Sequence, residues 1–110
     1  MNASIKQAWI KALRSGKYQQ GKENLCALGK FCCLGVLTDI YIQETGQEWH
    51  HDIGSFYSFE TEGSLLPLSV QQWAGIDGCN PYICGNHLTA WNDQRELSFE
   101  ELADLIEKHL

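Results

Sequence analysis

The sequence has little proline, no long apolar run and few basic residues after residue 30. Its 110 residues include only two prolines, which leaves no proline-rich linker at which to divide the chain. No segment approaches the roughly 18 consecutive apolar residues that a membrane-spanning helix needs. The N-terminus lacks the apolar stretch and cleavage site of an export signal. We therefore expect a single cytoplasmic domain over residues 1–110, with no membrane partner.

The basic residues are concentrated near the N-terminus. The chain carries 8 Lys and Arg against 14 Asp and Glu, a net charge of −6, which excludes a general nucleic-acid binder. Residues 1–30 contain six basic residues and one acid, a net charge of +5. Residues 31–110 contain two basic residues and thirteen acids, a net charge of −11. This asymmetry predicts a confined anion-binding site on an otherwise acidic protein.

Hydrophobic periodicity predicts an α+β fold that is mainly helical, with two or three short strands. Apolar residues three to four apart indicate helices at about 3–15, 33–44 and 98–109, and shorter ones at 66–73 and 88–91. Asn2 is the expected N-cap of the first helix, and Ser98 with Glu101 forms the capping box of the last. Glycines and short apolar runs predict a small hairpin or an extended loop within 17–33, the segment 55–60 is a candidate strand, and residues 76–86 are expected to form a loop.

The segment ALRSGKYQQGK at residues 12–22 has the chemistry of an anion site. Arg holds phosphate through two parallel hydrogen bonds, Lys supplies a point charge, and an aromatic ring can stack on a base. A tryptophan in a polar loop and an asparagine in a later turn extend the candidate ligand-binding set to Arg14, Lys17, Tyr18, Gln20, Lys22, Trp49 and Asn92. The alternative is a solvated basic face that pairs with the acidic residues of the body.

A cysteine nucleophile is a second interpretation. Five cysteines in a cytosolic chain are expected to be reduced, and Cys33 opens a predicted helix whose dipole favours a thiolate. The segment FCCLGVLTDIY at 31–41 resembles the nucleophile segment of NlpC-type cysteine peptidases, which implies a hydrolase. Its base would be His87, His50 or His51. Adjacent cysteines on an apolar helix are, however, more often buried small hydrophobic residues.

Neither a metal nor a cofactor is expected. The cysteine pairs are separated by five residues at 26–32 and by four at 79–84, wider than the knuckles of structural zinc sites. The chain also lacks the phosphate-binding loop and the dinucleotide fingerprint of nucleotide enzymes. Asp39 lies inside the apolar central helix, where we expect it to pair with a Lys or Arg of the basic segment; the alternative partner is a ligand hydroxyl.

Several segments resemble small proteins encoded by tailed phages and prophages. They are WIKALRSGKYQQGK at 9–22, FCCLGVLTD at 31–39, LPLSVQQWAG at 66–75, NPYI at 80–83, LTAWND at 88–93 and SFEELADLIE at 98–107. The resemblance brings no activity, but it implies a counter-defence role. One such role is that of a small, often homo-oligomeric sponge that sequesters a nucleotide immune signal without catalysis. The leading hypothesis is therefore a binding protein for a small anionic nucleotide-like ligand. The alternatives are the Cys33 hydrolase and a protein that inhibits a host factor by binding it.

Overall fold

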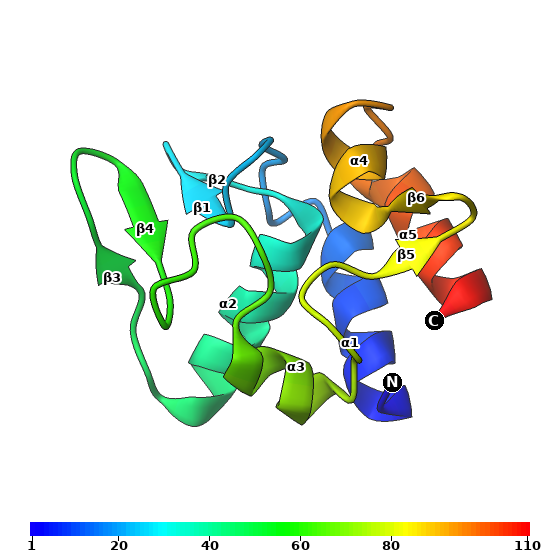
Figure 1. Cartoon of the computed structure of the whole chain (residues 1–110), viewed down its shortest axis with the longest axis horizontal. Helices are drawn as coiled ribbons and strands as arrows, with labels where there is room; N and C mark the ends of the chain where they lie inside the picture. The colour runs from blue at the N-terminus through cyan, green and yellow to red at the C-terminus, as the bar shows by residue number, and fades with distance from the viewer.

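Helix α2 (Cys33–Thr45) lies at the centre of the fold, and its first six residues are all buried. In the computed structural model, which describes residues 1–110, α1 (Ala3–Arg14), α3 (Leu68–Ala74) and α4 (Leu88–Asp93) all contact α2, as Figure 1 shows. Helix α5 (Phe99–His109) packs mainly on α1. Five helices and two small antiparallel sheets confirm the predicted α+β fold.

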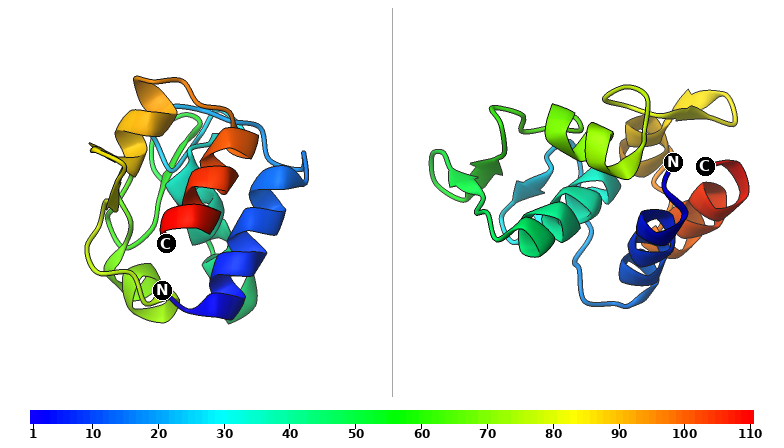
Figure 2. Two further views of the ribbon diagram at one scale, coloured as in Figure 1. Left: turned by 90° about the vertical axis from the view of Figure 1, so that its right-hand side faces the viewer. Right: turned by 90° about the horizontal axis from the view of Figure 1, so that it is seen from below.

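The two outer helices begin where their capping residues predict. The Asn2 side chain accepts a hydrogen bond from the amide of Ile5, and Ser98 and Glu101 form the reciprocal capping box of α5. Their apolar faces meet each other and the core, so the two helices lie side by side with both chain termini close together (Figure 2). None of the five helices is long and apolar enough to cross a lipid bilayer.

The shorter helices differ slightly from the prediction. Helix α3 begins at Leu68 and ends at Ala74, so Pro67 is its N-cap and lies just outside its first turn. Helix α4 continues past the expected turn to Asp93. This extension matters because it places Asn92 inside the helix, facing α2.

The larger sheet has the strand order β2-β1-β4-β3, with every neighbouring pair antiparallel. Its strands are β1 (Cys26–Ala27), β2 (Lys30–Phe31), β3 (His50–His51) and β4 (Phe56–Ser58). The hairpin β1–β2 and the strand β4 confirm the predictions. Strand β3 was not predicted, because two exposed histidines show no apolar alternation.

A second hairpin corrects the prediction of a loop at residues 76–86. Strands β5 (Tyr82–Ile83) and β6 (Asn86–His87) pair across the two-residue turn Cys84–Gly85. Both turn residues have positive φ, 52° and 88°, as a tight hairpin turn requires. A non-glycine residue in that conformation leaves little sequence signal, so the turn was missed.

The chain that leads into the larger sheet lies directly on helix α2. The Leu25 amide donates to the carbonyl of Gly63, and the Leu25 carbonyl faces Gly35 of the helix. A Cβ atom on Gly35 would lie 1.8 Å from that carbonyl oxygen. Only glycine therefore allows the two backbones to approach this closely.

We expect Gly35→Ala to lower the free energy of unfolding by about 3 kcal/mol or more, because the added methyl group meets rigid backbone. Gly63→Ala is the matched control, since a Cβ there meets nothing within 4 Å and its φ is not positive. Urea denaturation of both variants measures the difference. Equal urea midpoints for the two variants would contradict this prediction, because they would show that the close approach of the two backbones at Gly35 does not contribute to stability.

Candidate functional site

Asn92 is a buried polar residue whose side-chain amide joins three segments of the chain. It is 1% exposed. Its Oδ1 accepts hydrogen bonds from the amide of Cys33 at 3.3 Å and from Nε2 of Gln20 at 3.0 Å. Its Nδ2 donates to the carbonyl of Gly21 at 2.9 Å and to Asp93 Oδ1 at 2.7 Å. The amide is therefore fully paired, as burial requires.

The bond to Cys33 satisfies a donor that the helix itself leaves open. The first four amides of an α-helix have no partner within the helix, and the N-cap of α2, Cys32, makes no side-chain capping bond. Asn92 supplies the missing acceptor from a residue 59 positions away. The start of the central helix and the position of α4 thus depend on one side chain.

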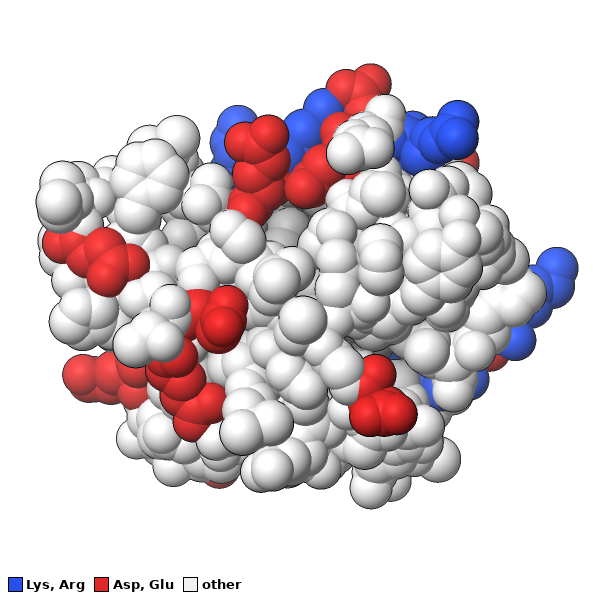
Figure 3. All heavy atoms as spheres, in the orientation of Figure 1, with Lys and Arg blue, Asp and Glu red and all other residues white.

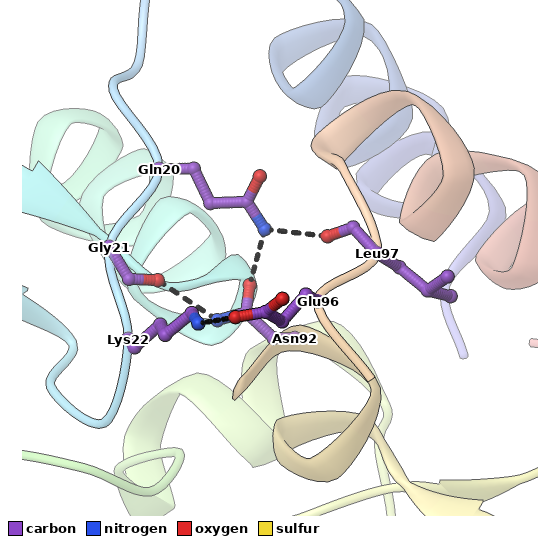
Figure 4. A pocket seen from close by; sticks show the side chains of 6 residues that line it. All are labelled: Gln20, Gly21, Lys22, Asn92, Glu96 and Leu97. Atoms are coloured by element: carbon purple, nitrogen blue, oxygen red, sulfur yellow. Dashed lines mark hydrogen bonds and ion pairs between the residues drawn. The ribbon is translucent and has the colours of Figure 1, made fainter. Parts of the chain in front are cut away.

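A small polar pocket lies against this cluster, between the segment at 20–22 and the loop that joins α4 to α5 (Figure 4). Its volume is about 230 Å³. The lining residues are Gln20, Gly21, Lys22, Asn92, Glu96 and Leu97. Three of the seven candidate ligand-binding residues, Gln20, Lys22 and Asn92, are therefore brought together.

Lys22 and Glu96 form an ion pair at the pocket. The hydrogen bond from Lys22 and its positive charge lower the pKa of the Glu96 carboxyl. The two residues are 74 positions apart and Glu96 is one of many acids, so no local pattern pointed to it. Gln20 adds a second link across the pocket, since its Nε2 also donates to the carbonyl of Leu97 at 2.8 Å.

Arg14 lies outside the pocket, against the acidic face of α5. Its guanidinium contacts Glu100 at 3.4 Å, Asp104 at 2.6 Å and Glu107 at 3.4 Å. The bonds to Asp104 and Glu107 raise the Arg14 pKa. Lys17 is exposed and makes no ion pair, so neither residue joins the pocket. Pairing with acidic residues of the body is what the alternative interpretation of the basic segment predicted.

The charge pattern of the surface agrees with this pairing. Figure 3 shows Lys and Arg side chains along the upper and right margins of one face, with acids among those at the upper margin. The left part of the same face carries acids and no Lys or Arg. The positive charge of residues 1–30 is thus partly neutralised within the fold, and Lys22 is the only basic residue that lines the 230 Å³ pocket.

Tyr18 and Trp49 are both held by Asp39. The Tyr18 hydroxyl donates to Asp39 Oδ2 at 2.6 Å, and the Trp49 indole donates to Oδ1 at 2.9 Å. Burial, and then the bond to Asp39, raises the pKa of Tyr18. The Phe31 ring lies near both rings, with centroids 5.0 Å from Tyr18 and 6.2 Å from Trp49. Asp39 therefore has aromatic donors where a Lys or Arg was expected, and both rings belong to the packed structure.

The Cys33 thiol is 0% exposed, and burial raises its pKa well above the ordinary value. The pKa of Cys32 rises to about 11 for the same reason, so desolvation outweighs the helix dipole that was expected to favour a thiolate. His87 makes no bond to Cys33, since its Nδ1 contacts the carbonyl of Asn80 at 3.1 Å. The arrangement argues against the Cys33 hydrolase.

The buried thiols and Tyr18 predict a loss of stability at alkaline pH. The pKa values of Cys32, Cys33 and Tyr18 are all higher in the fold, so the unfolded chain releases these protons first as pH rises. The contribution of the two thiols to stability is present below their ordinary pKa of 9.0 and falls above it, and that of Tyr18 falls above its ordinary pKa of 10.0. We expect urea midpoints to be level from pH 7 to 8 and to fall above pH 9.

The double variant Cys32→Ala/Cys33→Ala removes two of these groups and should show a shallower fall between pH 9 and pH 11. A midpoint for the unmodified chain that stays constant up to pH 11 would contradict the burial of these protons.

Comparison with known proteins gives a family and no activity. The chain belongs to the family described as Domain of unknown function (DUF8296), whose model matches residues 1–110. No curated protein and no solved structure matches the chain.

Proposed function

We propose that this member of a family without a described activity is a non-catalytic protein that sequesters a small, anionic, nucleotide-derived ligand at the 230 Å³ pocket. The phage counter-defence role suggested by the sequence resemblance belongs to the same proposal. One observation carries it: Gln20, Lys22 and Asn92, chosen as ligand-binding residues from chemistry alone, line one pocket although the chain separates the first from the last by 72 positions.

Lys22 supplies the anion contact in this proposal. Its side chain is 50% exposed and that of Glu96 is 68% exposed, so the ion pair lies in water at the pocket. A pair this exposed is weak, because solvent screens the attraction. A phosphate, which brings more charge and more acceptors than one carboxylate, can therefore displace Glu96 from Lys22 without unfolding any element.

Gln20 supplies a hydrogen-bond acceptor, whereas Lys22 supplies a charged donor. Its Nε2 is occupied by Asn92 and Leu97, whereas its Oε1 accepts no hydrogen bond within the protein. That oxygen is available to a hydroxyl or amino group of a ligand.

A pocket of about 230 Å³ is smaller than the roughly 300–1,000 Å³ of typical small-molecule sites. We infer that it receives the phosphate and sugar end of the ligand and leaves the base outside.

The surroundings of the pocket favour binding over turnover. Its lining includes one amine, one carboxylate and two amides, with no cysteine, serine or histidine. Asn92 has all its hydrogen-bonding capacity occupied, so its role is to position Gln20 and the Gly21 backbone. A ligand held by such groups is expected to be released unchanged.

The proposal is tested by thermal unfolding with ADP-ribose, cyclic mononucleotides and cyclic dinucleotides as separate probes. At a ligand concentration 100 times the dissociation constant, binding stabilises the fold by about 2.7 kcal/mol and raises Tm by roughly 10 °C. Lys22→Gln should weaken binding by about tenfold or more, because a charged hydrogen bond is lost. Glu96→Gln should strengthen it, because a competing carboxylate is removed.

Lys17→Gln is the matched control, since it removes one positive charge from the same segment outside the pocket, and it should bind as the unmodified chain does. Chromatography of the ligand released on heating must recover it intact. The proposal fails if no probe shifts Tm, if the released ligand is altered, or if Lys17→Gln and Lys22→Gln weaken binding equally.

A further inference from the structure

An exposed cysteine and a histidine meet far from the pocket described above. Cys84 Sγ lies 3.0 Å from His109 Nε2, although the residues are 25 positions apart. Cys84 is in the turn of the β5–β6 hairpin, and His109 is the last residue of α5. The hairpin lies beside the C-terminal end of α5 in Figure 1. Neither residue lines the proposed ligand pocket.

The fold holds both partners in place. Cys84 has φ of 52° and is followed by Gly85 at 88°, and the Tyr82 hydroxyl donates to the Gly85 carbonyl at 2.9 Å, so the turn is held by its own hairpin. His109 lies in the last turn of α5, so the helix fixes the position of its ring. Its Nε2, 3.0 Å from Cys84 Sγ, is placed to accept the thiol proton when the sulfur attacks.

A pocket of about 300 Å³ adjoins the two segments that carry the pair. Its lining residues are Met1, Gly75, Ile76, Asp77, Pro81, Tyr82 and Leu110. Tyr82 is two residues before Cys84, and Leu110 directly follows His109. This hollow, half of it apolar, offers room for the part of a reagent that does not react.

We propose that Cys84, paired with His109, is a reactive thiol that undergoes exchange with low-molecular-weight disulfides. As His109 Nε2 accepts the thiol proton, Cys84 Sγ attacks one sulfur of the disulfide, a new sulfur–sulfur bond forms, and the original one breaks. The departing thiolate takes the proton that His109 held, so the products are a mixed disulfide on Cys84 and one free thiol. No further oxidant is needed, because the incoming disulfide is itself reduced.

The other four cysteines make this reactivity selective. Cys26, Cys32 and Cys33 are buried. Cys79 is exposed as Cys84 is, but its thiol contacts no imidazole. Cys79 therefore reports how fast an ordinary surface thiol of this protein reacts, within the same molecule and under the same conditions.

Glutathione disulfide is the probe, and peptide mass spectrometry at neutral pH follows the rate at each cysteine of the native protein. We expect Cys84 to react about tenfold faster than Cys79. His109→Gln should reduce the Cys84 rate to near that of Cys79 and leave the Cys79 rate unchanged. Lys108→Gln, which removes a neighbouring positive charge without touching the thiol, should retain most of the Cys84 rate.

Circular dichroism melts of both variants are expected to match that of the unmodified chain, because Lys108 and His109 are exposed. Equal rates at Cys84 and Cys79 in the unmodified chain would overturn the proposal. So would an unchanged Cys84 rate in His109→Gln, or an equal fall in Lys108→Gln. None of these results bears on ligand binding at the distant pocket, so the two proposals fail independently.

Discussion

The structure depends on the buried amide of Asn92, which supplies an acceptor to the N-terminus of α2 and holds the segment at 20–21 against α4. Burying an amide without hydrogen-bond partners is costly, so each of the four hydrogen bonds of Asn92 constrains the position of its partner group. The start of the central helix and the pocket lining at Gln20 and Gly21 are consequently held by the same side chain. A change that loosens one of them is expected to loosen the other.

The basic N-terminal segment serves two purposes in this fold. Arg14 binds the acidic face of α5 and so joins the first helix to the last. Lys22 lies at the pocket with a single exposed carboxylate as partner. The net charge of the segment therefore overstates the number of cations that are free to meet a ligand. Position in the fold, and not net charge, distinguishes Lys22, which lines the pocket, from Arg14, which is held by α5.

Helices were predictable from the sequence because their signals are local. Asn2 and Ser98 cap the helices that follow them, and the apolar spacing of α2 spans its whole length. The two-residue strands were harder, because β3 and β5 are too short to show an alternating pattern of their own, although each pairs with a strand close to it in the sequence. Cys84, a non-glycine residue with positive φ in the second hairpin, gives no such signal.

The candidate site was predictable in part. Residue chemistry pointed to Gln20, Lys22 and Asn92, but no pattern could show that Tyr18 and Trp49 both donate to Asp39. Glu96 and the Cys84–His109 contact were missed for the same reason, since each joins segments that only the fold brings together. Local chemistry thus identifies candidate residues, whereas their partners require the structure.

The free energy of unfolding of Asn92→Ala tests this account most directly. The substitution leaves the Cys33 amide, the Gly21 carbonyl and the Gln20 amide without their partner, so we expect a loss of about 3 kcal/mol or more. Asn86→Ala, at a half-buried position of β6 outside this cluster, should change it by about 0.5 kcal/mol at most. Equal stabilities for the two variants would contradict the central role of Asn92.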